Sequence, residues 1–318
     1  MVTLADVEAA REVIRDVAIV TPMEQSRWLS ALVGGPVWLK CENLQRTGSF
    51  KIRGGYVRIS RLTPEERARG VVAASAGNHA QGVALAAQLL GIKSTVFMPE
   101  GAPIPKERAT RAYGADVVFE GHVLEESLVG ARRFAEETGA VLIHPFDHVD
   151  IVAGQGTLGV ELMQQAPDLD AVFVSVGGGG LVGGLGTAIK RIRPQTRIVG
   201  VWPENSAAML GALEAGAIID VEERDTLSDG TAGAVEPGSI TFLICQAVID
   251  DRVTVSEAEI AQAMRRIAGA ERWMVEGAAG VALAGLVRQA GAWRGRKVAV
   301  VLCGRNIALD TFIKAVAA

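Results

Sequence analysis

The sequence is poor in aromatic residues and in cysteine, and both shortages narrow the class of protein. Aromatic residues make up 5% of the 318 residues, and the cysteines are Cys41, Cys245 and Cys303. An odd number of distant cysteines without metal-like spacing argues against a disulfide framework or a zinc site. The first residues are charged early and form no apolar signal core. We therefore expect a soluble protein of the reducing cytoplasm.

The chain also lacks a run of basic residues, and its net charge is −4. A nucleic-acid partner is therefore not expected. One uncharged stretch, residues 171–189, approaches the length of a membrane span, but seven of its residues are glycine and four of these are consecutive. This composition predicts a strand, a loop and a helix, so no membrane partner is expected either.

Short apolar runs alternate with amphipathic segments along most of the chain. Strands are predicted at residues 71–75, 95–98, 116–119, 140–143, 171–176, 197–201 and 297–302. Helices are predicted at residues 79–90, 105–113, 124–138, 156–165, 181–193, 256–267 and 279–290. This alternation predicts an α/β fold with parallel strands and helical crossovers. A length of 318 residues favours two domains or one large α/β domain. Residues 222–238 form the least regular segment and are a candidate mobile loop.

Four consecutive glycines, Gly177 to Gly180, follow a predicted strand and precede a predicted helix. Glycine lets backbone N–H groups converge on an anion, and the helix N-terminus adds a favourable dipole. A merely flexible turn is the alternative, but each glycine costs about 0.5–1 kcal/mol of ordering entropy. No Lys-Ser or Lys-Thr follows, and Val201-Trp-Pro203 stands where a dinucleotide site needs an acidic residue. The run therefore predicts a phosphate site that is neither a P-loop nor a dinucleotide site.

Three further segments carry polar groups near strand ends. They are Thr47-Gly-Ser-Phe-Lys-Ile-Arg-Gly54, Ser75-Ala-Gly-Asn-His79 and Cys303-Gly-Arg-Asn306. Alone, each has an ordinary explanation as a solvated lysine, a capped loop or a small buried cysteine. Together with the glycines they supply an amine that can form a Schiff base, an anion cradle, an amide and a lone pair. That set suits an aldehyde cofactor that carries a phosphate.

At this point the sequence resembles the serine/threonine dehydratase and serine racemase group of pyridoxal 5′-phosphate (PLP) enzymes, the fold type II class. The matching segments occur in the order and spacing of that family and cover nearly the whole chain. They are Ser49-Phe-Lys-Ile-Arg-Gly54, Ser75-Ala-Gly-Asn-His-Ala-Gln-Gly82, His144-Pro-Phe-Asp147, Ala153-Gly-Gln-Gly-Thr157, Gly177-Gly-Gly-Gly-Leu181 and Cys303-Gly-Arg-Asn306.

The resemblance implies a role for each segment toward PLP. Lys51 would form the Schiff base, Phe50 would pack near the cofactor ring, and Asn78 would hydrogen-bond the 3′-oxygen of the ring. Cys303 would face the pyridine nitrogen, which a thiol, unlike a carboxylate, does not keep protonated. The phosphate would be held by Gly177, Gly178, Gly179, Gly180 and Leu181. The substrate would be received by Ser75, Ala76, Gly77, Asn78 and His79.

The sequence departs from the family pattern in three places. Ala76 stands where serine racemases carry a serine base, which favours elimination over racemisation. Trp202 and Ala208 stand where the racemases carry metal-ligating acids, so no metal is expected. The usual Ser-Gly-Gly-Asn is here Cys303-Gly-Arg-Asn306, and Arg305 together with Glu276-Gly-Ala-Ala-Gly280 makes the sequence resemble a branch of the family associated with hydroxyectoine breakdown. Little sequence follows Cys303, and a C-terminal regulatory domain is not expected.

The resemblance implies two doubly wound open-sheet domains similar to the tryptophan synthase β fold. The expected large domain joins residues 1–64 and 146–318, and residues 65–145 form the small one. The expected activity is removal of the hydroxyl and amino groups of a small β-hydroxy amino acid such as L-threonine or L-serine, which releases a 2-oxo acid and ammonia. A homodimer or homotetramer is also expected.

Other functions stay open. Within the PLP class they are dehydration of a hydroxyectoine-derived, aryl-serine or hydroxyaspartate substrate, serine racemisation, and β-replacement of the cysteine-synthase type. Outside that class, a non-catalytic α/β protein that binds a phosphate or a nucleotide is the alternative.

Overall fold

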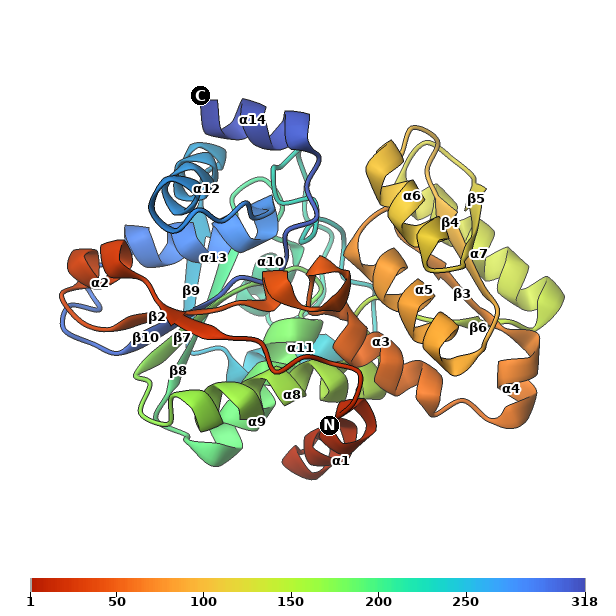
Figure 1. Ribbon diagram of the computed structural model, residues 1–318, viewed down its shortest axis with the longest axis horizontal. Coiled ribbons are helices and arrows are strands. Elements are labelled where there is room, and N and C mark those ends of the chain that lie inside the picture. Colours follow the sequence, from red (N-terminus) through yellow and green to blue (C-terminus); the bar gives the residue numbers. More distant parts are fainter. Residues whose placement is uncertain (1, 318) are drawn as a thin grey trace.

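The computed structural model describes residues 2–317, which form two open sheets flanked by helices (Figure 1). The larger sheet has six strands in the order β1-β2-β10-β7-β8-β9. β1 is antiparallel to β2, and the other neighbouring pairs are parallel. The strands are β1 (Met23–Gln25), β2 (Val37–Lys40), β7 (Ala171–Ser175), β8 (Arg197–Pro203), β9 (Asp251–Val255) and β10 (Val298–Val301).

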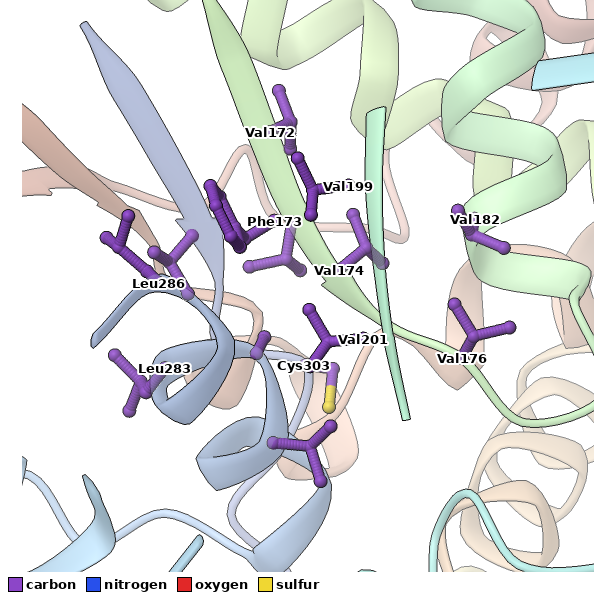
Figure 2. Close-up of a cluster of buried hydrophobic side chains, with 14 of the residues drawn as sticks. Val172, Phe173, Val174, Val176, Val182, Val199, Val201, Leu283, Leu286 and Cys303 are labelled. Carbon is purple, nitrogen blue, oxygen red and sulfur yellow. The ribbon is translucent and has the colours of Figure 1, made fainter. Parts of the chain in front are cut away.

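Helices cover both faces of this sheet, as parallel strands require. Helix α13 (Gly277–Arg288) contacts β7 to β10 and packs against α12 (Glu257–Glu271), whereas α8 (Val149–Gln165) and α9 (Gly180–Ile192) pack together on the other face (Figure 1). Figure 2 shows Phe173 of β7 toward Leu286 of α13, with Val182 of α9 on the opposite side. The main hydrophobic core therefore fills both sides of the six-stranded sheet.

The smaller sheet is entirely parallel, in the order β5-β4-β3-β6. Its strands are β3 (Val71–Ala74), β4 (Ser94–Met98), β5 (Asp116–Phe119) and β6 (Val141–Leu142). Alternate residues face opposite sides: Val72 packs with Ala131 of α7 (Leu124–Thr138), and Val96 packs with Ala84 of α5 (Asn78–Leu90). Helix α6 (Ile104–Ala112) lies beside α5.

The remaining helices lie at the edges and between the two sheets. They are α1 (Leu4–Ile14), α2 (Arg27–Val33), α3 (Lys51–Ser60), α4 (Pro64–Arg69), α10 (Ala208–Ala215), α11 (Ile240–Val248) and α14 (Leu309–Ala317), with 3₁₀ turns at Glu42–Leu44 and Arg46–Gly48. Helix α3 contacts both α5 and α8, so it connects the two sheets (Figure 1). It begins at Lys51.

The expected fold class, with two doubly wound open sheets, is confirmed. The division into domains at residues 65 and 145 stays a prediction. Within residues 2–317 no helix is long and apolar enough to cross a membrane. The uncharged stretch 171–189 forms β7, a loop and part of α9.

One helix differs clearly from its predicted bounds. The sequence predicted a helix from Gly156, whereas α8 begins seven residues earlier, at Val149. His148 caps it by accepting a hydrogen bond from the Asp150 N–H at 3.1 Å. The glycines that obscure its helical pattern are needed for packing, because a Cβ on Gly154 would lie 2.5 Å from the Cα of Gly54 in α3.

A buried network of four charged side chains holds the start of α3 in place. Arg53 donates to both carboxylate oxygens of Glu42 and of Glu161, with N–O distances of 2.7–2.9 Å. Lys40 donates to Glu161 at 2.7 Å. The Arg53 and Glu42 side chains are fully buried. Two positive and two negative charges balance, and each carboxylate is held by several hydrogen bonds, as a buried ion pair requires.

The network makes a testable prediction about stability. Replacing Arg53 with methionine leaves buried carboxylates without their partner, so the free energy of unfolding should fall by about 3–5 kcal/mol. The same replacement at Arg197, whose half-exposed side chain pairs with Asp251, should lower the free energy of unfolding by only about 0.2–1 kcal/mol. Urea unfolding of the two variants measures the difference. Equal losses in the two variants would contradict this account of the network.

Candidate active site

Chemically informative segments meet at one edge of the large sheet. β2, β10 and β7 are adjacent and parallel, so the chain leaves all three at the same edge. β2 leads to Lys51, β10 leads to Cys303 and β7 leads to Gly177. Ligands of open α/β sheets bind at such an edge.

Backbone pairing joins the segment before α3 to the segment after β10. The Phe50 N–H donates to the Cys303 carbonyl at 3.2 Å, and the Arg305 N–H donates to the Gly48 carbonyl at 3.0 Å. A turn with positive φ at Thr47 (65°) and Gly48 (71°) directs the chain into this pairing. The pairing places Lys51 beside Cys303 although 252 positions separate them in the sequence.

A single cavity of about 490 Å³ contains every residue that the sequence predicted for the site. The thirteen predicted residues in its lining are Phe50, Lys51, Ser75, Ala76, Gly77, Asn78, His79, Gly177, Gly178, Gly179, Gly180, Leu181 and Cys303. The structure therefore brings the whole predicted set together. Their individual roles stay predictions.

Lys51 projects its amine into this cavity. Its Nζ donates to the Pro145 carbonyl at 2.9 Å and lies 5.4 Å from the centroid of the Phe50 ring. Within residues 2–317 the amine forms no salt bridge. Burial lowers the pKa of Lys51 to about 8, and the nearby Cys303 and Glu276 only partly oppose the shift. With this pKa, about one tenth of the amine is neutral, and therefore nucleophilic, at pH 7, and about half of it at pH 8.

The four glycines form a backbone cradle at the start of α9. Gly179 has a φ of 86°, which L side chains rarely adopt, and α9 begins at the next residue. A Cβ on Gly177 would lie 2.7 Å from the Thr231 carbonyl oxygen, and one on Gly179 would lie 2.6 Å from the Cys245 sulfur. The first N–H groups of a helix have no partner within it. The cradle thus offers free donors and excludes side chains, which suits a phosphate.

The segment after β3 forms the opposite wall of the cavity. The Gly77 N–H donates to the Ser75 hydroxyl at 3.1 Å, and α5 begins at Asn78. The His79 ring is buried, which lowers its pKa to about 3, so the ring is neutral. Its Nε2–H donates to the Ile143 carbonyl at 2.7 Å. One nitrogen of the ring is therefore already engaged by the protein.

Cys303 combines a core position with a place on the cavity wall. It belongs to the main hydrophobic core, and Figure 2 shows its sulfur within that cluster. Its sulfur lies 3.6 Å from the Ser175 hydroxyl, which is within hydrogen-bonding distance. Burial raises the pKa of the thiol, and the charge of Glu276 raises it further. The thiol is consequently protonated and neutral.

Sequence reasoning missed Glu276 as a site residue. It lines the cavity and accepts a hydrogen bond from Asn78 Nδ2 at 2.7 Å. Burial raises the pKa of Glu276 to about 7, with a further contribution from Asp229. One signal was available, because Glu276 is the only charged residue between Arg272 and Arg288. A lone acid in such an apolar stretch indicates a buried functional or structural carboxylate.

Two ion pairs near the cavity were also missed, and Lys106, Asp229 and Glu236 of these pairs line it. Lys106 of α6 pairs with Asp229 at 2.5 Å, and Arg132 of α7 pairs with Glu236 at 2.7 Å. Both join helices of the smaller sheet to residues 229–236, which are part of the segment 222–238 that the sequence predicted to be a mobile loop. The partners are more than 100 residues apart, and no local pattern could have revealed them.

The functional groups that line the cavity are those needed to bind an aldehyde cofactor that carries a phosphate. The cavity holds a free amine of lowered pKa, a glycine cradle for an anion, an amide and a neutral thiol. In the described part of the chain, no three His, Cys, Asp or Glu side chains are grouped so as to hold a metal ion.

Comparisons with known proteins agree with this chemistry. A sequence model of the family described as pyridoxal-phosphate dependent enzyme matches residues 14–304. The chain is 46% identical over 307 residues to an L-threonine ammonia-lyase of Thermotoga maritima, which covers 96% of this chain and 76% of that protein. It is 40% identical to an L-threo-3-hydroxyaspartate ammonia-lyase of a Pseudomonas species, over 96% of both chains.

A solved structure gives the same result for the fold. Maize serine racemase superposes with a TM-score of 0.93 at 32% identity, over 99% of this chain and 97% of that one. The family match spans most of the sequence, and the cavity contains the groups that the cofactor needs. The chain belongs to the family of pyridoxal-phosphate dependent enzymes.

Proposed function

We propose that this protein is a PLP-dependent ammonia-lyase that dehydrates a small β-hydroxy amino acid, such as L-threonine or L-serine, to a 2-oxo acid and ammonia. The observation that carries the proposal is the Lys51 amine, which has a pKa of about 8 and faces a cavity with a glycine cradle. The similarity to an L-threonine ammonia-lyase over 96% of the chain supports it.

Lys51 serves as the attachment point and as the base. When bound, PLP withdraws electrons from the α-carbon of an attached amino acid and so weakens the bond to the α-proton. The lowered pKa of Lys51 leaves the released amine partly neutral at pH 7–8, so Nζ can accept that proton. The Pro145 carbonyl, 2.9 Å from Nζ, orients the amine within the cavity.

The glycine cradle holds the phosphate of PLP, and the opposite wall of the cavity holds the carboxylate of the substrate. Gly177 to Gly180 bind the phosphate through backbone N–H groups at the start of α9. Ser75, Gly77 and the start of α5 bind the substrate carboxylate, because the free N–H groups of a helix start attract an anion. With both ends held, the α-carbon stays close to Lys51.

Cys303 sets the electronic character of the site. Its thiol is neutral, because burial raises its pKa, and it therefore offers the ring nitrogen no negative charge. Beside this neutral thiol, the ring nitrogen of a bound PLP would not be held in its protonated form, and the weaker electron withdrawal would favour loss of the β-hydroxyl. This is the chemistry of a lyase.

Racemisation and other substrates are the competing functions. Ala76, in the cavity wall, has no group that exchanges a proton, which disfavours racemisation. An L-threo-3-hydroxyaspartate substrate is supported by the relative that acts on it. Hydroxyectoine-derived and aryl-serine substrates remain in the proposal as alternatives. Arg305, the residue that suggested the hydroxyectoine branch, lies outside the cavity lining.

The oligomeric state and the subcellular location form part of the same proposal. We expect a homodimer or homotetramer in the cytoplasm, with a small amino acid as the only other partner. The whole chain aligns with the maize enzyme, so the proposal concerns all of it and not one sheet alone.

The phosphate cradle can be tested with Gly179→Ala. Alanine at a φ of 86° costs about 1–2 kcal/mol, and its Cβ would press on Cys245, so the dissociation constant for PLP should rise about tenfold. Pyridoxal, which lacks the phosphate, should bind as before. Gly291→Ala is the matched control, since a Cβ there meets nothing within 4 Å. Fluorescence titration gives each constant, and an equal loss for pyridoxal would refute a phosphate cradle.

The amine can be tested through pH. Because the pKa of Lys51 is lowered from 10.5 to about 8, its neutral form is half populated near pH 8 and increases above it. The rate at which the apoprotein takes up PLP should therefore rise from pH 6 to about 8.5 and then level off. Stopped-flow absorbance measures this rate. A rate that keeps rising to pH 10 would mean that Lys51 is an ordinary exposed lysine.

The reaction itself can be tested with a substrate panel. The holoenzyme should release 2-oxo acid and ammonia in equal amounts from L-threonine or L-serine. The panel also contains L-threo-3-hydroxyaspartate, an aryl-serine and a hydroxyectoine-derived amino acid, and chiral analysis detects D-serine. Lys51→Ala should lower the rate roughly 10²–10⁴-fold. Absence of oxo-acid release from every member would rule out the lyase.

A further inference from the structure

Three side chains beside the cavity form a closed hydrogen-bonded cluster. Asn78 Nδ2 donates to Glu276 Oε1 at 2.7 Å, and Asn306 Nδ2 donates to Asn78 Oδ1 at 2.6 Å. The backbone N–H of Asn306 donates to Glu276 Oε2 at 3.0 Å. Glu276 is 2% exposed, so water does not compete for these bonds. Both ends of the Asn78 amide are therefore held by the protein.

The direction of these hydrogen bonds is fixed by groups that can only accept. Asn306 Nδ2 also donates to the Thr47 carbonyl at 2.7 Å, which establishes which end of the Asn306 amide is nitrogen. At the other end, the Glu276 carboxylate has no proton to donate once it is ionised, above its pKa of about 7. If the Asn78 amide turned by 180°, its oxygen would face the Glu276 carboxylate and its nitrogen would face the Asn306 amide nitrogen. That orientation is strongly disfavoured.

An amide nitrogen carries two N–H groups, and Glu276 uses only one of them. Asn78 lines the cavity, so its second N–H is available to a bound group. From this geometry we infer that Glu276 is a positioning residue, which fixes the Asn78 amide so that an N–H, and not the carbonyl oxygen, faces the ring oxygen of the cofactor. The inference rests on the contact that the proposed function assigns to Asn78.

The glycines packed around Glu276 are a second observation, because they leave the space that its carboxylate occupies. A Cβ on Gly304 would collide with Glu276 Oε1, so the residue after Cys303 must lack a side chain for Glu276 to lie here. Gly230 also approaches both groups, since a Cβ there would lie 3.7 Å from Glu276 Oε1 and 3.9 Å from Asn78 Nδ2.

The cluster also connects the two sheets. Asn78 begins α5, which packs on the smaller sheet, whereas Glu276 precedes α13 and Asn306 follows β10, both in the larger body (Figure 1). The orientation of the amide is thus set by residues from the opposite wall of the cavity. The ring oxygen therefore meets a fixed donor only when the two walls are in contact.

The test replaces Glu276 with glutamine, which keeps the volume but can both donate and accept. Glutamine has a single oxygen for the two donors that Glu276 serves, Asn78 Nδ2 and the Asn306 N–H. When that oxygen accepts from Asn306, the glutamine nitrogen faces Asn78 and opposes its present orientation, so the donor toward the ring oxygen is held less firmly. At pH 8, above the Glu276 pKa of about 7, the dissociation constant for PLP should rise about tenfold. The dissociation constant for 3-deoxypyridoxal 5′-phosphate, which lacks the ring oxygen, should change less than about twofold. The pH titration of the visible absorbance band should also move to higher pH, because the ring oxyanion loses a donor.

Glu257→Gln is the matched control, because Glu257 also accepts from a backbone N–H, that of Leu227 at 2.7 Å, and lies outside the cavity lining. It should bind both compounds like the unchanged protein. If Glu276→Gln weakens both compounds equally, its role is structural and the inference fails. Asn78→Ala separates the two hypotheses. Normal PLP binding by that variant would overturn the Asn78 contact in the proposed function, whereas weak binding with a normal Glu276→Gln would overturn only this inference.

Discussion

The chemistry of this protein depends on the pairing between the segment before α3 and the segment after β10. The Phe50 and Arg305 N–H groups donate to the Cys303 and Gly48 carbonyls. These two bonds bring the first residue of α3, which carries the amine, to the wall that carries the thiol. The buried Arg53 network then holds the same helix turn from behind. The helix that carries the amine is placed by the backbone and by ion pairs, and the amine itself is oriented by the Pro145 carbonyl.

The same burial that builds the core also adjusts the reactive groups. It lowers the pKa of Lys51, raises that of Glu276 and keeps the Cys303 thiol protonated. Burial thereby makes the Lys51 amine easier to deprotonate and keeps the Cys303 thiol neutral, as their expected tasks need, whereas the raised pKa of Glu276 works against the ionised form that holds Asn78. The four charged side chains of the Arg53 network are buried as well, but each of them is paired with a group of opposite charge.

Much of the fold could be predicted because alternation of apolar runs is a local signal. Strands and helices between residues 71 and 142 lie within about two residues of their predicted bounds. The start of α8 was missed because its glycines, which serve helix contacts, conceal the helical pattern. All thirteen predicted site residues share one cavity, since ordered motifs at strand ends locate a site well. The Lys106–Asp229 pair could not be assigned, because its partners are distant in the sequence and no local pattern encodes the contact. Glu276 stood out as a lone acid in an apolar stretch, but its partner Asn78 is 198 positions away, so its role could not be read from the sequence.

The contact of α8 with its two neighbours restricts how the sequence can change. Its Gly154 meets the backbone of Gly54 in α3, and on the other side the Gly184 backbone of α9 meets Val152 and Gly156. Three helices are thus stacked with main chain against main chain, and the addition of a single methyl group at these positions would push α3 outward. Any evolutionary path to a new substrate must therefore leave this stack untouched. Variation is open instead to the walls contributed by α6 and α7, whose Lys106, Leu124 and Leu128 line the cavity.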